Sequence, residues 1–226
     1  MKEALFRDPR ELGPRDSVVW RGNDLSVERL VAAYRAGIFP WPSGGPEIPW
    51  HCPDPRGLLL FNRLHFPRSL KSAMRRNHFR FSFNRAFADV IRACAEIPRI
   101  GESGETWISK EMIDAYLRLY EEGWAHSVEC WDGTELVGGV YGVCVEGVFS
   151  GESMFYSRPN ASKLALFRLI DALECRGQKF MDIQMVTPVT QALGGGYAPR
   201  RAYLDLLARA RMMGFPKKLD LSDEER

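Results

Sequence analysis

Residues 125–155 read AHSVECWDGTELVGGVYGVCVEGVFSGESMF, and this stretch decides the fold. Within it, Asp132-Gly133 and Glu146-Gly147 are hairpin-turn signals with strand-forming residues on both sides. The stretch therefore predicts a β-meander, which we place at the centre of the fold.

Strands and amphipathic helices are expected to alternate around this meander from Leu58 onward. Phenylalanines alternate with polar residues at 79–83, as in a half-buried strand. Helical spacing of apolar residues follows Ser26, Asn84, Ser109, Asn160 and Pro199, and the first four of these residues are the expected N-caps of their helices. Residues 180–185 read as a strand. This order favours an α/β or α+β unit on a mostly antiparallel sheet.

The composition is that of an ordinary globular protein. The chain has 226 residues, of which 45% are hydrophobic and 27% charged, and this excludes disordered, collagen-like and coiled-coil classes. The N-terminus lacks the apolar stretch of a secretory signal, and the longest apolar run is too short to span a bilayer, so we expect a cytoplasmic protein without a membrane partner. The five cysteines include no Cys-x-x-Cys pair, which predicts buried free thiols and no metal site.

The net charge is only +2, so attraction to nucleic acid must come from where charge is placed. No acidic residue occurs between Asp54 and Asp89, although this interval holds eight Lys or Arg residues. If Pro67 starts a helix, one face of it carries Arg68, Lys71, Arg75 and Arg76. Such a face suits phosphate contacts; the alternative is an ordinary solvated helix face.

Three polar residues interrupt apolar strand patterns and are candidates for chemistry. Glu152 is flanked by small residues that let a ligand approach, and a carboxylate there can bind an amine. Asp182 and Gln184 lie two apart on a strand, so they are expected on one face, in one hydrogen-bonded network. The alternative for each carboxylate is a structural ion pair. No nucleophile triad is recognisable.

Trp41, Trp50 and Trp107 lie in Pro-rich or Gly-rich surroundings, where they can offer flat faces to a nucleobase; core packing is the alternative. Residues 158–163 occupy the place of the pyrophosphate loop of acetyltransferases but contain no glycine. An acyl-CoA donor is therefore disfavoured.

Nine short stretches of the chain match the motifs of a known family in order and at compatible spacings: AYRAGIFPW at 33–41, PDPR at 53–56, TWI at 106–108, AHSVE at 125–129, LVGG at 136–139, YGV at 141–143, GESMF at 151–155, NASK at 160–163 and PRR at 199–201. With these stretches the chain resembles the bacterial leucyl/phenylalanyl-tRNA–protein transferases.

The resemblance implies an α+β fold with a small N-terminal domain (1–55) and a catalytic domain (56–226). The second would have the fold of GCN5-related N-acetyltransferases, a mixed, mostly antiparallel sheet flanked by helices. It also implies transfer of Leu or Phe, and less well Met, from the acceptor end of aminoacyl-tRNA to proteins with N-terminal Arg or Lys, which marks them for N-degron proteolysis. No cofactor is implied.

By resemblance, the residues fall into four groups. Asp182 and Gln184 match a catalytic acid–amide pair in which the acid polarises the amide, and Glu152 matches a carboxylate that holds the reacting groups. The aminoacyl-adenosine would meet Trp41, Trp107, Tyr34 and Tyr116; the side-chain pocket would be Met154, Val140 and Ile183; and the basic face would bind the tRNA acceptor stem.

Two other functions remain open from the sequence. One is an acyl-CoA N-acetyltransferase of the same fold, against which the glycine-free segment argues. The other is a non-catalytic RNA-binding module, which would leave Glu152, Asp182 and Gln184 unexplained. We expect a monomer, because no apolar surface stripe remains after the core helices are assigned.

Overall fold

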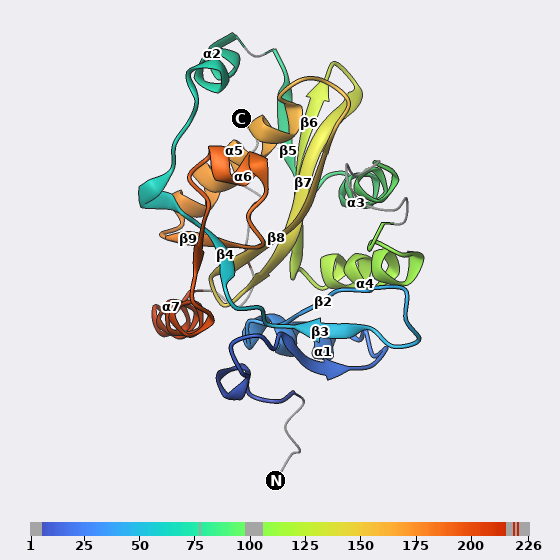
Figure 1. Cartoon of the computed structure of the whole chain (residues 1–226). Helices are drawn as coiled ribbons and strands as arrows, with labels where there is room; N and C mark the ends of the chain where they lie inside the picture. The colour runs from blue at the N-terminus through green and yellow to red at the C-terminus, as the bar shows by residue number, and fades with distance from the viewer. Residues whose placement is uncertain (1–5, 77, 98–105, 216–218, 220, 222–226) are drawn as a thin grey trace.

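A computed structural model describes residues 6–76, 78–97, 106–215, 219 and 221. Helices and strands follow one another along the chain in an α+β arrangement (Figure 1). The α-helices are α1 (Val27–Arg35), α2 (Arg68–Arg76), α3 (Phe87–Glu96), α4 (Lys110–Glu121), α5 (Ala161–Cys175), α6 (Pro188–Ala192) and α7 (Arg200–Met212).

The larger of two sheets has seven strands in the order β10-β4-β9-β8-β7-β6-β5. All its pairings are antiparallel except that of β8 with β9, so the sheet is mixed and mostly antiparallel, as the sequence predicts. Its strands are β4 (Arg56–Leu60), β5 (Arg80–Phe83), β6 (Ala125–Asp132), β7 (Glu135–Val145), β8 (Val148–Tyr156), β9 (Phe180–Gln184) and β10 (Gly196–Ala198).

The parallel pair β8–β9 is short. It is registered only at Phe149 with Met181 and at Ser150 with Asp182, after which the two strands diverge. The residues that follow on each strand, Glu152 and Gln184, therefore lie where the sheet opens. This divergence places two of the predicted functional side chains opposite each other.

The smaller sheet comes from the N-terminal part of the chain and has the order β1-β3-β2. Its strands are β1 (Val18–Arg21), β2 (Phe39–Pro40) and β3 (Pro49–His51). It lies beside α1 at one end of the molecule, whereas α2 lies at the other end (Figure 1).

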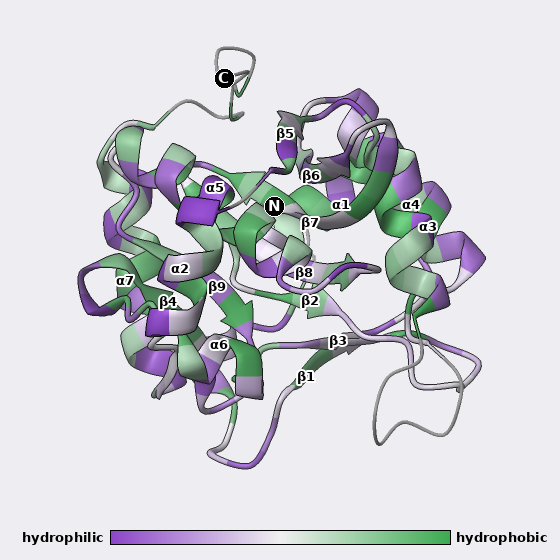
Figure 2. Ribbon diagram, turned by 90° about the horizontal axis from the view of Figure 1, so that it is seen from above, coloured by the Kyte–Doolittle hydropathy of each residue, from purple (hydrophilic) through white to green (hydrophobic). Residues whose placement is uncertain are grey.

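Two hydrophobic clusters fill the molecule, and the large sheet separates them. One lies between the sheet and α5, while the other packs against α3, α4 and the N-terminal part. The second cluster runs without a break from Leu30 and Trp50 to Met112 and Tyr203. Figure 2 shows hydrophobic residues along the central strands and hydrophilic ones on the outer turns of the helices.

The predicted meander is confirmed as β6, β7 and β8, with turns at Gly133 and Gly147, both of which have positive φ. Two predicted caps are confirmed as well, because the side chains of Ser26 and Ser109 accept hydrogen bonds from the first turns of α1 and α4.

The predicted cap at Asn84 is wrong. The residue before α3 is Ala86, and Asn84 instead adopts φ 58° and accepts the backbone N–H of Ser127 through its side chain. Asn160 does precede α5, but it has φ 70° and makes no side-chain capping bond. Both residues adopt a backbone conformation with positive φ, which asparagine tolerates better than most residues.

Four of the cysteines are buried and free, while Cys175 is exposed, contrary to the expectation that all are buried. Among the described residues, no group of His, Cys, Asp and Glu is placed to hold a metal ion. The described helices are all too short or too polar to cross a membrane.

Arg200, at the start of α7, joins this helix to the N-terminal part. It is buried, and its guanidinium donates to the carbonyl oxygens of Leu12, Gly13, Asp16 and Cys52 at 2.6–3.0 Å. Arginine is rarely buried without partners, and here the partners of the guanidinium are four backbone carbonyl groups.

The Arg200→Ala substitution should lower the free energy of unfolding by about 3 kcal/mol, because it leaves buried carbonyl groups without donors. The exposed neighbour provides a matched control, since Arg201→Ala should change the free energy by less than about 0.5 kcal/mol. Urea unfolding curves of both variants give the comparison; equal effects would contradict the structural role of Arg200.

Candidate active site

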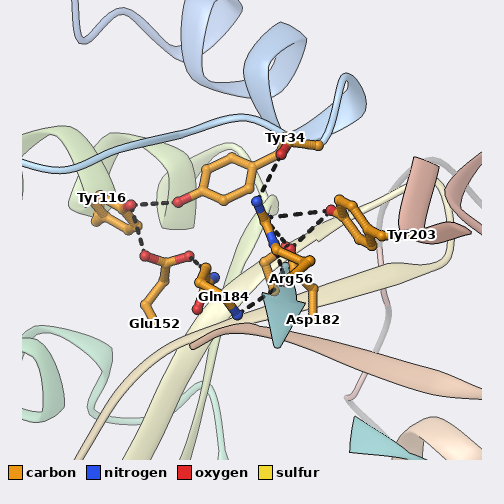
Figure 3. A network of polar contacts seen from close by, with 9 residues as sticks. Tyr34, Arg56, Tyr116, Glu152, Asp182, Gln184 and Tyr203 are labelled. Atoms are coloured by element: carbon orange, nitrogen blue, oxygen red, sulfur yellow. Dashed lines mark hydrogen bonds and ion pairs between the residues drawn. The ribbon is translucent and has the colours of Figure 1, made fainter. Parts of the chain in front are cut away.

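A buried ion pair lies at the centre of the polar residues. Arg56 on β4 binds Asp182 on β9 in a two-pronged arrangement, with Nε–Oδ1 at 2.7 Å and Nη2–Oδ2 at 2.5 Å (Figure 3). Both side chains are almost fully buried. Burial alone would lower the pKa of the Arg56 guanidinium, but the negative charge of Asp182 raises this pKa by more. The net shift is upward, so the arginine stays protonated.

Further hydrogen bonds complete the surroundings of this pair. The hydroxyl of Tyr203 on α7 donates to Asp182 Oδ2 at 2.9 Å, and Ser150 Oγ reaches the same oxygen at 3.3 Å. The remaining Arg56 nitrogen, Nη1, donates to the Gly37 carbonyl at the end of α1. The ion pair thus ties β4, β9, α1 and α7 together.

Glu152 faces this network because of a β-bulge. The register of β7 and β8 passes from Tyr141–Ser153 to Gly142–Gly151, which leaves Glu152 as the extra residue on β8. Its Oε2 accepts from the Tyr116 hydroxyl at 3.1 Å. The bulge therefore turns the carboxylate toward α4.

Burial raises the pKa of Glu152 to about 7, although hydrogen bonds from Tyr34 and Tyr116 act in the opposite direction. The hydroxyls of these two buried tyrosines are 2.5 Å apart. Burial and the negative charge of Glu152 raise both tyrosine pKa values well above the ordinary range. Glu152 is therefore the group of this network suited to exchange a proton near neutral pH.

Gln184 contacts the carboxylate oxygen of Glu152 that Tyr116 does not bind. Its side-chain Nε2 lies 3.2 Å from Glu152 Oε1, whereas its backbone N–H donates to Asp182 Oδ1 at 3.1 Å. The expectation that Asp182 and Gln184 share one network is confirmed, but the contact runs through the backbone of Gln184. The side-chain amide faces Glu152 because Gln184 has φ 50° and leaves the regular strand.

Trp41 and Trp107 come from distant parts of the chain and stack on each other, with ring centroids 5.2 Å apart and an interplanar angle of 19°. Trp107 is buried and Trp41 is half-buried. Phe39 contacts Trp41 edge-on, and its ring also carries the guanidinium of Arg56. The tryptophan pair therefore adjoins the ion pair.

The three residues of the expected side-chain pocket lie in the cluster beneath α5. Val140 is directly opposite Met154 in the β7–β8 register, and Ile183 belongs to the same cluster. Tyr34 and Tyr116 belong to the other cluster, so the sheet separates these two groups. Glu152 and Gln184, at the opening of the sheet, lie between them.

The predicted basic helix is confirmed as α2, with Leu70 buried and the four basic residues exposed: Arg68, Lys71, Arg75 and Arg76. It lies at the end of the molecule away from the small sheet, so these residues are not part of the polar network (Figure 1).

Sequence reasoning missed Arg56 and Tyr203 as site residues. Arg56 is one of the eight basic residues of the interval without acidic residues, but the structure shows that it is buried. An arginine at the head of an otherwise apolar strand was the available signal, because such a charge needs a buried partner. Tyr203 gave no signal, since it fits the apolar face of α7.

Two family models match the chain. The model described as "Leucyl/phenylalanyl-tRNA protein transferase" matches residues 58–208, and that of its N-terminal domain matches residues 23–54. Relatives named leucyl/phenylalanyl-tRNA–protein transferase are similar over most of their length. The protein of Syntrophobacter fumaroxidans is 47% identical over 208 residues, covering 92% of this chain and 88% of its own. That of Myxococcus xanthus is 45% identical over 202 residues, covering 89% and 86%.

Among solved structures, L-PGS from Bacillus licheniformis gives a TM-score of 0.43 at 11% identity, over 72% of this chain and 66% of that chain. This likeness is too weak to assign a fold, and the acetyltransferase-like architecture stays a prediction.

These sequence matches place the chain, with its α+β fold and buried polar network, among the enzymes of the aminoacyltransferase class. Within that class, the chain belongs to the leucyl/phenylalanyl-tRNA protein transferase family.

The raised pKa of Glu152 predicts a pH-dependent stability difference between the wild type and Glu152→Gln. A carboxyl whose folded-state pKa is about 7 stabilises the fold fully below the unfolded value of 4.5 and loses that contribution as pH rises through 7. Since glutamine does not titrate, the stability of the wild type relative to the variant should fall by up to about 3 kcal/mol between about pH 5 and about pH 8. Urea unfolding at both pH values measures this; a constant difference would contradict it.

Proposed function

We propose that this chain transfers Leu or Phe, and less well Met, from aminoacyl-tRNA to the α-amine of proteins that begin with Arg or Lys. The product carries a new peptide bond and an N-degron for proteolysis. The observation that carries this proposal is the contact between the side chains of Glu152 and Gln184, in a chain of this family.

The chemistry needs no covalent nucleophile, because the ester between amino acid and tRNA is already activated. It needs positioning, loss of a proton from the attacking amine, and stabilisation of the oxyanion. The amine nitrogen attacks the ester carbonyl carbon, the bond to the ribose oxygen breaks, and that oxygen leaves with a proton. The same reaction explains why a Ser-His-Asp triad is not required.

In the proposed reaction centre, Glu152 holds the amine and takes up its proton, for which a pKa of about 7 is well suited. The proton can then pass to the departing ribose oxygen. The Gln184 amide lies within reach of the same carboxylate and orients the reacting groups, while Asp182 supports Gln184.

For the aminoacyl-adenosine we propose contact with the tryptophan pair, Trp41 being the more exposed ring. Tyr34 and Tyr116 are buried and act there through their hydrogen bonds to each other and to Glu152. The apolar residues Met154, Val140 and Ile183 are proposed to receive the Leu or Phe side chain. Such a pocket rejects a poorer fit by only about 1–3 kcal/mol, which is consistent with slower use of Met.

We also propose a cytoplasmic monomer with a boundary between its two parts at residues 55 and 56. The change from the small sheet to the large sheet supports this boundary, since β3 ends at His51 and β4 begins at Arg56. The exposed basic residues of α2 support the binding of a tRNA acceptor stem through phosphates.

With tRNA charged with radiolabelled Leu or Phe, label should enter a model protein that begins with Arg. Gln184→Ala should lower the rate by at least about 10-fold, because an amide that orients the transition state is lost. A protein beginning with Asp and acetyl-CoA as an alternative donor are the controls. Absence of transfer by the folded wild type with bound tRNA would overturn the proposed function.

The Arg75→Ala substitution on α2 should weaken tRNA binding and reduce the slope of log Kd against log salt by about 1, as expected when one phosphate contact is lost. Arg92→Ala removes an exposed arginine from α3 and should leave that slope unchanged. Filter binding at several salt concentrations measures both. An unchanged slope in Arg75→Ala would count against the basic face of α2.

A further inference from the structure

Gln184 adopts an unusual backbone conformation. Its φ is 50°, and the N–H of Met185 donates to the carbonyl of Ile183 at 2.5 Å, which closes a turn of three residues. A turn of this kind with positive φ at its central residue is rare and strained for a residue with a side chain. The surrounding structure must therefore hold it in place.

Asp182 provides that support. Its Oδ1 accepts the backbone N–H of Gln184 at 3.1 Å and Arg56 Nε at 2.7 Å, so one carboxylate oxygen joins the turn to the arginine. Its Oδ2 accepts from the Tyr203 hydroxyl and from Arg56 Nη2. With donors on both oxygens, the carboxylate has one orientation, and the turn is fixed to it.

This turn also sets the direction of the Gln184 side chain. The amide nitrogen points across the opening between β8 and β9 to Glu152 Oε1 at 3.2 Å. Asp182 is fully buried, and its hydrogen bond to Gln184 is to the backbone. Its effect on the reacting atoms can therefore pass through the conformation of Gln184.

From this arrangement we propose that Arg56 and Tyr203 are positioning residues. They orient Asp182, and Asp182 holds the left-handed turn that directs the Gln184 amide at Glu152. This inference rests on the proposed function and refines it, because it assigns Asp182 a mechanical role and adds two residues whose substitution changes catalysis without touching substrate.

The Tyr203→Phe variant tests the proposal with little change in packing. It should lower kcat by about tenfold, which is the size of one hydrogen bond to a charged group. The KM for aminoacyl-tRNA should stay the same, because no substrate contact is removed. The matched control is Tyr120→Phe, which removes a hydroxyl bonded to the Asn84 carbonyl and should leave kcat unchanged.

A double-mutant cycle separates positioning from a general structural effect. If Tyr203 acts through Gln184, then Tyr203→Phe should have little effect on kcat in the Gln184→Ala background. The same fold-loss in both backgrounds would overturn the proposal. Arg56→Lys keeps the positive charge but not the two-pronged geometry, so its loss should also shrink in that background.

A readout that does not need transfer distinguishes failure of this inference from failure of the proposed function. The side-chain NH2 signals of Gln184 in an NMR spectrum can be assigned by their loss in Gln184→Ala. They should shift in Tyr203→Phe and stay in place in Tyr120→Phe. Unmoved signals in Tyr203→Phe would overturn the positioning role whether or not the wild type transfers Leu or Phe.

Discussion

The buried pair of Arg56 and Asp182 is the interaction on which the rest of the site depends. Placing two charges out of water is costly unless each finds several partners, and here both do, through Gly37, Tyr203 and Ser150. These three partners come from the end of α1, from α7 and from β8, and the pair itself joins β4 to β9. The pair has all its partners only when the neighbouring strands of the large sheet, the end of α1 and α7 are in place. The site can therefore form only when the fold is complete.

The parts of the fold that the sequence predicts are those with local causes. Turn pairs such as Asp132-Gly133 and the cap at Ser109 act over a few residues, and the strand and helix periods beside them are equally local. The N-cap prediction at Asn84 is wrong for a related reason. Asparagine is a suitable residue type for a cap, but a hydrogen bond with Ser127 on β6 decides the conformation of this one. Residue type states what a side chain can do, and distant contacts select among those options.

The same limit applies to the site. Glu152, Gln184 and the tryptophans are recognisable because they interrupt a pattern, but their geometry is not. Charge spacing alone does not distinguish the exposed Arg75 from the buried Arg56, whose partner lies 126 residues away in the chain. The aim of Gln184 likewise depends on a backbone turn that only the assembled strands produce. Sequence thus identifies the chemical groups, and tertiary structure gives them their directions.

The N-terminal part and the larger sheet share one continuous hydrophobic cluster, which affects how the molecule unfolds. Leu30 and Trp50 share it with Met112, and the stacked rings of Trp41 and Trp107 cross the same junction. Because they share this cluster, we expect the two parts to unfold together as one cooperative unit. A ligand that stacks on these rings would tighten the entire molecule, so that occupancy and resistance to unfolding rise together.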